Sequence, residues 1–350
     1  MSHTSAGLKL VMAAAALALP IGAHAQTFKV DKFNIGGEGG FDYVSVDPAG
    51  RVFVSRGTHM MVVDGMTGKV LGDIANTPRV HGAAFSPKSG FGFTTNGGDS
   101  TVTMFALKDL SIVRRIHAGI NGLDGIMFDD GTDRIFTSNH SGATRGATGT
   151  LTAIDAKTGE VIGNVPLAGV PEGAASDGNG TLFVNLEDKN QIEMVDARTL
   201  KSKGTWAIAP CDGPTGIGID RKMHRLFVGC SKTSVVVDSK TGKVVAQITN
   251  GDNVDALSYD PDQQLIYIPS GEGKVTVVKA ASGDKYNVVA EPATMRGART
   301  IGLDVKSHRA YVFTPEYGPA PTPPAGSPPP AGRGGPRGPL IGAWFFAMSH

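Results

Sequence analysis

The sequence contains little cysteine, little tryptophan and almost no net charge. Two cysteines and two tryptophans occur in 350 residues, and the formal net charge is +1 at pH 7. A chain that binds nucleic acid usually carries a basic surface, so this balance argues against a nucleic-acid partner. Two cysteines are also too few for a structural zinc site, which usually takes four ligands.

Several catalytic motifs are missing as well. The sequence has no Gly-x-Ser-x-Gly, which excludes an α/β-hydrolase, and no Cys-x-x-Cys-His for covalent haem attachment. The glycine-rich stretch at 36–40 resembles a phosphate-binding loop, but no Gly-Lys-Ser/Thr follows it. We interpret this stretch as a flexible connection.

The first 25 residues have the composition of a secretory signal. Lys9 precedes a short apolar run over 10–21, and an Ala-x-Ala site ends at Ala25. The run is too short for a membrane anchor, and no other apolar run could span a bilayer. We therefore expect residues 1–25 to be a cleaved signal peptide, and residues 26–350 to form one domain. The mature protein is then periplasmic or secreted, without a stable membrane anchor.

A pattern of four short strands, first seen over 41–74, recurs along the chain. Aligned on the turn after the first strand, the repeats begin their turns at Asp47, Ser86, Asp129, Asp177, Asp220, Asp260 and Asp304. An aromatic residue then stands at a fixed place in each second strand, at Phe53, Phe93, Phe136, Phe183, Phe227, Tyr267 and Tyr311. Seven such units predict an all-β fold, a seven-bladed β-propeller of four-stranded antiparallel blades.

The ends of the chain fit closure of this ring. The seventh unit has only two strands before the proline-rich stretch begins. Residues 342–349 have the composition of a strand and can supply the third strand of this blade. Residues 28–35 alternate apolar and polar side chains, so we expect this N-terminal strand to complete the last blade. Residues 315–340 are rich in proline and glycine, and we expect an unpaired loop inserted in the last blade. A shorter insertion at 139–149 takes the equivalent place in blade three.

The second strands carry a resemblance to a known family. They read FVSR, FTTN, FTSN, FVNL, FVGC, YIPS and YVFT. These segments resemble the Tyr-Val-Thr-Asn repeat, so the mature chain resembles a YncE-like member of the YVTN β-propeller family, although blades four to seven depart at the Asn. The resemblance implies the propeller fold. Members are described as binding or surface proteins, and related propellers include lactonases and quinoprotein dehydrogenase subunits, so the fold does not name a reaction.

Two rings of residues are expected at one mouth of the central channel. The inner ring lies five residues before each turn, at Asp42, His81, Asp124, Glu172, Thr215, Asp255 and Arg299. The outer ring lies at the ends of the second strands, at Arg56, Asn96, Asn139, Leu186 with Glu187, Cys230, Ser270 and Thr314. His140, Arg145 and Arg296 are expected to overhang the same mouth. Cys211 would approach Cys230, so a disulfide is predicted, with two free thiols as the alternative.

Three interpretations of the rings remain open. In the first, the polar residues only hydrate the channel, because carboxylates beside Arg need no catalytic explanation. In the second, the rings bind a small polar ligand or a periplasmic protein, through Asp42, Arg56, His81, Asn96, Asp124, Asn139, Glu172, Asp255 and Arg299.

The second interpretation includes a metal site. Four carboxylates could bind Ca²⁺ or another divalent metal, namely Asp42, Asp124, Glu172 and Asp255. His81 could join them for a transition metal. No other cofactor follows from the sequence.

The third interpretation is catalytic. A lactonase-like hydrolase acting on a lactone or ester would use His81 with Glu172 or Asp124 as acid and base. Arg299 or Arg56 would polarise the ester carbonyl. Binding is the preferred function, the hydrolase is the alternative, and a monomer is expected.

Overall fold

The computed structural model describes residues 26–40, 42–119, 122–140, 148–321 and 337–350. The signal-peptide prediction for 1–25 therefore lies outside the described residues, as does the prediction for Arg145. Most of the blade-three insertion and most of the proline-rich stretch also lie outside them. Among the described residues, no helix is long and apolar enough to cross a membrane.

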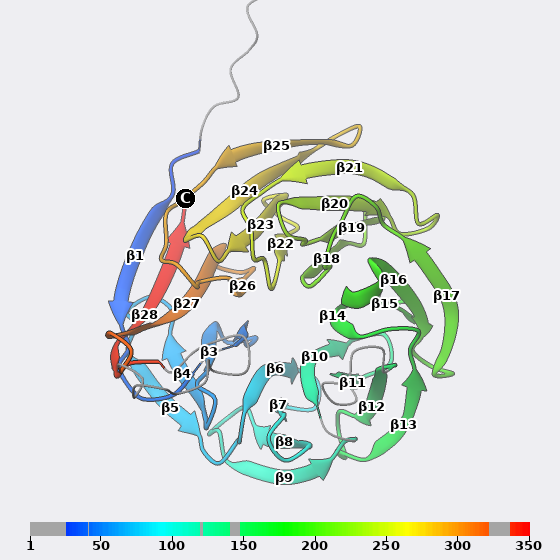
Figure 1. Ribbon diagram of the computed structural model, residues 1–350. Helices are drawn as coiled ribbons and strands as arrows, with labels where there is room; N and C mark the ends of the chain where they lie inside the picture. Colours follow the sequence, from blue (N-terminus) through cyan, green and yellow to red (C-terminus); the bar gives the residue numbers. More distant parts are fainter. Residues whose placement is uncertain (1–25, 41, 120–121, 141–147, 322–336) are drawn as a thin grey trace, which may run out of the picture.

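Seven four-stranded antiparallel sheets stand in a ring around a central axis (Figure 1). Blade one contains β2 (Val44–Val46), β3 (Arg51–Ser55), β4 (Met60–Asp64) and β5 (Val70–Ile74). Blade two contains β6 (Val80–Ser86), β7 (Phe91–Asn96), β8 (Thr101–Ala106) and β9 (Ile112–His117). Blade three contains β10 (Leu123–Asp129), β11 (Arg134–Asn139), β12 (Thr150–Asp155) and β13 (Val161–Pro166). In each of these blades the strands follow chain order from the axis outward.

The next three blades repeat this order. Blade four contains β14 (Pro171–Ser176), β15 (Thr181–Leu186), the short helix η1 (Glu187–Lys189), β16 (Gln191–Asp196) and β17 (Lys201–Ala207). Blade five contains β18 (Ile217–Asp220), β19 (Arg225–Val228), β20 (Thr233–Asp238) and β21 (Val244–Thr249). Blade six contains β22 (Ser258–Asp260), β23 (Leu265–Ser270), β24 (Lys274–Ala281) and β25 (Lys285–Ala290). The predicted seven-bladed all-β fold is confirmed.

Blade seven joins the two ends of the chain. Its strand order is β26 (Ile301–Asp304), β27 (Arg309–Tyr317), β28 (Leu340–Ser349) and then β1 (Lys29–Asn34). The N-terminal strand β1 pairs along β28, as the sequence predicts. Because first and last segments share one sheet, the ring has no open gap between its ends.

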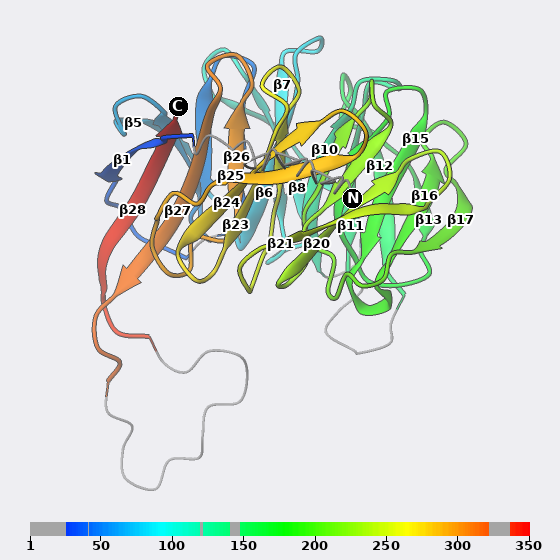
Figure 2. The same cartoon turned by 90° about the horizontal axis from the view of Figure 1, so that it is seen from above.

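One detail of the proline-rich stretch differs from expectation. Pro315 was expected to lie in an unpaired loop, but β27 continues through it and Pro315 is the partner of Ala343. Strand β26 ends its pairing with β27 at Val312, so one side of β27 is an edge at this point, where proline is tolerated. The chain that follows β27 and the chain that precedes β28 leave the disc on one side (Figure 2).

The repeated residues form the interior of the blades. The seven aromatic residues of the second strands are at most 2% exposed, so they fill the space between adjacent sheets. The recurring Asp turns are also built as the sequence indicates. Asp47 Oδ1, for example, accepts hydrogen bonds from the backbone N–H groups of Ala49 and Arg51, and Gly50 between them has φ of 83°.

Candidate functional site

The innermost strands place the inner ring at one end of the channel. His81, Asp124 and Glu172 are each the second residue of their innermost strand, β6, β10 and β14. All three lie at an irregularity where the pairing with the second strand shifts register. A β-bulge changes the direction in which a side chain points, which here presents the three side chains to the channel mouth.

Small residues make the channel narrow at this level. The residue after the ring residue is glycine or alanine in five consecutive blades, at Gly82, Gly125, Gly173, Gly216 and Ala256. A Cβ atom on Gly173 would lie 2.5 Å from the carbonyl oxygen of Thr215, so the neighbouring strands approach too closely for a side chain there. The backbone N–H of Gly173 donates to that same oxygen.

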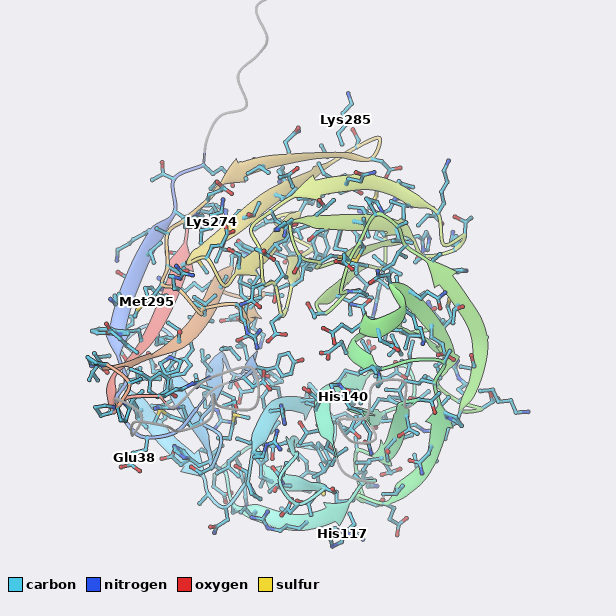
Figure 3. The ribbon with its side chains drawn as sticks, in the orientation of Figure 1. Glu38, His117, His140, Lys274, Lys285 and Met295 are labelled. Atoms are coloured by element: carbon cyan, nitrogen blue, oxygen red, sulfur yellow. A yellow bond between two sulfur atoms is a disulfide. The ribbon has the colours of Figure 1, made fainter. Side chains whose placement is uncertain are left out.

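Carboxylates and imidazoles alternate around half of the mouth. His81 Nδ1 forms a hydrogen bond with Asp42 Oδ2 and lies 3.5 Å from Asp124 Oδ1. His140 Nε2 lies 3.7 Å from Asp124 Oδ2 and 3.5 Å from Glu172 Oε1. We call these five residues the acid–imidazole cluster, and Figure 3 shows His140 beside the central opening.

His140 was expected only as an overhanging residue, yet it is a full member of the cluster. It directly follows Asn139, the last residue of β11, so the end of that strand carries it over the mouth. Tyr43 also joins the site and was not predicted. Its hydroxyl donates to Glu172 Oε2 at 3.4 Å. Its place directly after Asp42 was the available signal.

Asp255 and Arg299 lie apart from the cluster and pair with each other. Arg299 Nη2 is 3.0 Å from Asp255 Oδ2, and Arg299 Nη1 donates to Asn253 Oδ1. Thr215 donates to the carbonyl oxygen of Val254. Among the described residues, the carboxylates that could share a metal ion are Asp42 with Asp124, and Asp124 with Glu172, each group including a histidine. The predicted four-carboxylate set therefore does not gather as one group.

Most of the predicted outer ring does not reach the mouth, although Glu187 is exposed and its charge adds to burial in raising the pKa values of Glu172 and Asp255. Arg56, Asn96 and Asn139 are fully buried. Arg56 donates to the carbonyl oxygens of Gly36 and Gly37, and Asn96 donates to two threonine hydroxyls of β8. The end of a second strand packs between blades, so these polar groups are used inside the fold. The structure gives them no surface from which to contact a ligand.

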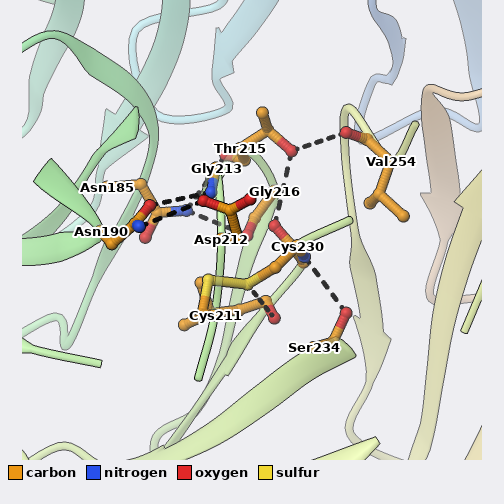
Figure 4. The surroundings of a disulfide bond; sticks show 12 residues. Asn185, Asn190, Cys211, Asp212, Gly213, Thr215, Gly216, Cys230, Ser234 and Val254 are labelled. Atoms are coloured by element: carbon orange, nitrogen blue, oxygen red, sulfur yellow. Dashed lines mark hydrogen bonds between the residues drawn. A yellow bond between two sulfur atoms is a disulfide. The ribbon is translucent and has the colours of Figure 1, made fainter. Parts of the chain in front are cut away.

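The predicted disulfide between Cys211 and Cys230 is confirmed. The two Cα atoms are 5.6 Å apart, and both residues are buried (Figure 4). Cys211 lies in the segment that enters blade five, and Cys230 follows β19. The bond therefore fixes the backbone that leads to Thr215 at the mouth. The alternative of two free thiols is wrong.

Burial and crowding change the acidity of the mouth. Burial raises the pKa of Asp255 to about 7, with the Arg299 charge opposing it. Burial also raises the pKa of Asp42, and it raises the pKa of Glu172 well above the usual value, where the Asp124 charge adds to it. For His81, burial lowers the pKa, but the Asp42 hydrogen bond and the Asp124 charge outweigh it and the net pKa is raised.

A cavity continues inward from the mouth along the channel. Its volume is about 190 Å³, and its polar lining includes Tyr43, Glu172, Thr215 and Asp255. The other lining residues are mainly the small and apolar residues of the innermost strands. The cavity holds the space of roughly six water molecules, so it fits a small group or one end of a larger ligand.

Comparisons with known proteins identify the fold and no family. No protein-family model matches the sequence, and no curated protein matches it. A chain of the crystal structure of the mitotic checkpoint complex has a TM-score of 0.68 and 14% identity, covering 89% of this chain and 95% of its own length. A Kuenenia stuttgartiensis hydrazine synthase chain has a TM-score of 0.67 and 15% identity, covering 79% and 93%. At such identities the similarity shows the propeller fold alone.

Proposed function

We propose that this protein is an exported β-propeller that binds a small polar ligand carrying positive charge at the channel mouth. The observation that carries the proposal is the acid–imidazole cluster. Within the described residues, the ion pairs of Asp42, Asp124 and Glu172 all involve histidine rather than lysine or arginine. Three crowded carboxylates without a permanent cation favour a ligand that supplies one.

The size of the site limits the ligand. The adjoining cavity of about 190 Å³, to which Glu172 contributes from the cluster, accepts a metal ion, an amine or a guanidinium group, but only one end of a larger molecule. A protein partner could bind in the same way, by inserting one basic side chain. The ligand is therefore recognised mainly by its charged end.

Export and family are also part of the proposal. The signal-type segment at 1–25 supports export, and a disulfide is typical of proteins outside the cytosol. The seven second strands support a YncE-like member of the YVTN family, periplasmic or secreted. A monomer is proposed because the chain closes its own ring.

Thermal unfolding of the purified protein with a panel of cations tests this function. The panel contains primary amines, guanidinium compounds and divalent metal ions, with carboxylic acids as the matched anions. At least one cation should raise the melting temperature while the anions do not. Glu172→Gln should remove that shift, whereas Asp262→Asn, an exposed carboxylate in the turn between β22 and β23, should keep it. A panel without any stabilising cation would overturn the proposal, as would an unchanged shift in Glu172→Gln.

A lactonase-like hydrolase is the second candidate, and one contact favours it. The carboxylate of Asp42 is hydrogen-bonded to Nδ1 of His81, an arrangement that orients an imidazole for general acid–base work. The other two residues proposed for catalysis are placed separately. Glu172 contacts His140 and Tyr43, and Arg299 pairs with Asp255.

A further inference from the structure

The second half of the acid–imidazole cluster has the spacing of metal ligands. Asp124 Oδ2 and Glu172 Oε1 lie 3.7 and 3.5 Å from His140 Nε2. Ligands about 2.0–2.2 Å from one ion lie at about this separation from one another. One donor atom from each of the three residues lies within 4.8 Å of the others.

Nε2 of His140 makes no hydrogen bond although it is buried. Oδ1 of Asp124 also lacks a hydrogen bond, but it faces Nδ1 of His81 at 3.5 Å, whereas Oδ2 faces His140. A buried polar atom without a partner costs free energy, which a bound ion would remove. The Glu172 side chain is held in place, since it is only 10% exposed and the Tyr43 hydroxyl donates to Oε2. Such a hydrogen bond leaves Oε1 directed at His140.

The first half of the cluster differs. Asp42 and His81 are hydrogen-bonded to each other, so the imidazole Nδ1 is already used. An ion bound at Nδ1 of His81 would have to replace this hydrogen bond. The half with His140 needs no such change.

We propose that Asp124, His140 and Glu172 bind one divalent first-row transition metal ion, such as Zn²⁺. This inference rests on the proposed function and names the cation that the mouth binds. Two carboxylates and one imidazole suit such an ion, whereas Ca²⁺ takes six to eight oxygen ligands. Three protein ligands leave coordination positions open, so a polar ligand could bind to the ion itself.

Calorimetric titration of chelator-treated, dialysed protein with ZnCl₂ tests the inference. We expect one zinc ion per chain. His140→Gln should lower the zinc affinity more than about 100-fold, which is more than the loss of a residue that only hydrogen-bonds to a metal ligand would cause. Glu172→Gln is the second variant, in case His140→Gln does not fold. His59→Gln removes an imidazole that pairs with Asp73 elsewhere on blade one, and it should bind as the parent does.

Two further measurements locate the ion. Co²⁺ should give visible absorption bands in the parent protein that are lost in His140→Gln and retained in His81→Gln. The proposal is overturned if no saturable binding occurs, if His140→Gln binds zinc as the parent does, or if His81→Gln alone abolishes binding. The last result would place the ion in the other half of the cluster.

Failure of this inference is distinguishable from failure of the proposed function. If amines or guanidinium compounds stabilise the chelator-treated protein through Glu172 but zinc does not bind, the metal inference fails and the proposed function stands. If neither binds, both fail.

Discussion

Arg299 and Asp255 form an ion pair of 3.0 Å that occupies one side of the channel mouth, opposite in character to the acid–imidazole cluster. This pair neutralises one carboxylate with a permanent cation. Within the described residues, the ion pairs of the three carboxylates of the cluster are all with imidazoles. The described part of the mouth is thus divided into a side where a carboxylate pairs with arginine and a side where carboxylates pair with histidines.

The first prediction concerns this pair. Arg299→Gln leaves Asp255 without its cation, so the pKa of Asp255 should rise above about 7. The free energy of unfolding at pH 8 should fall by about 1–3 kcal/mol, less than for a fully buried pair because Arg299 is partly exposed. Urea unfolding measures the loss. Adding Asp255→Asn should restore part of it, and Lys285→Gln on the outer strand β25 is the control.

Stability should fall as the pH rises. A carboxyl group with a raised folded pKa stabilises the protein fully below its unfolded pKa of 3.8, and this contribution is lost as the pH rises through about 7 for Asp255. Asp42 and Glu172 act in the same direction, because burial raises their pKa values as well. The raised pKa of His81 has the same sign, with its contribution lost above the unfolded value of 6.5.

The free energy of unfolding should therefore decrease from roughly pH 4 to roughly pH 8, as urea titrations at several pH values would show. Glu172→Gln should flatten this dependence, since the amide cannot ionise. A free energy that rises over the same interval in the metal-free protein would contradict the assignment.

Arg56 should matter for stability and not for binding. Its guanidinium is fully buried and donates to the carbonyl oxygens of Gly36 and Gly37, while it lies over the ring of Phe313. Arg56→Met keeps the volume but removes the donors, and we expect a loss of about 2 kcal/mol in the free energy of unfolding. The zinc affinity of the folded variant should stay within a factor of two. A stable Arg56→Met variant that no longer binds zinc would contradict this prediction, because it would indicate that Arg56 contributes to binding.

The hydrolase candidate makes a kinetic prediction. If it holds, the purified protein hydrolyses lactones or esters, and His81→Ala abolishes the turnover because the general base is lost. Asp42→Asn should lower the rate less and shift its pH profile, since it alters only the orientation and acidity of His81. A broad lactone and ester panel without turnover, or turnover that His81→Ala leaves intact, counts against catalysis.

The inner ring shows how far repeat alignment can place a site. Asp42, His81, Asp124 and Glu172 follow from counting back five residues from each turn, and the structure brings them into one cluster. The ends of the aligned second strands assigned Asn96 and Asn139 to an outer ring, but both are buried inside the fold. Alignment of the repeats gives the position of a residue along its strand. The direction of its side chain depends on the pleat of the strand, on β-bulges and on packing between blades.

The sequence by itself determined the propeller, because strand periodicity and one aromatic per second strand are local properties that repeat seven times, and an Asp begins the turn after the first strand in six of the seven units. It also indicated which segments close blade seven, and it predicted a Cys211–Cys230 disulfide with two free thiols as the alternative, a choice that the structure decided. Only the tertiary structure decided which polar residues share the mouth. In the structure His140 contacts Glu172, Asp255 pairs with Arg299, and Arg56 is buried. Each of these contacts depends on distances between blades, which no local sequence pattern encodes.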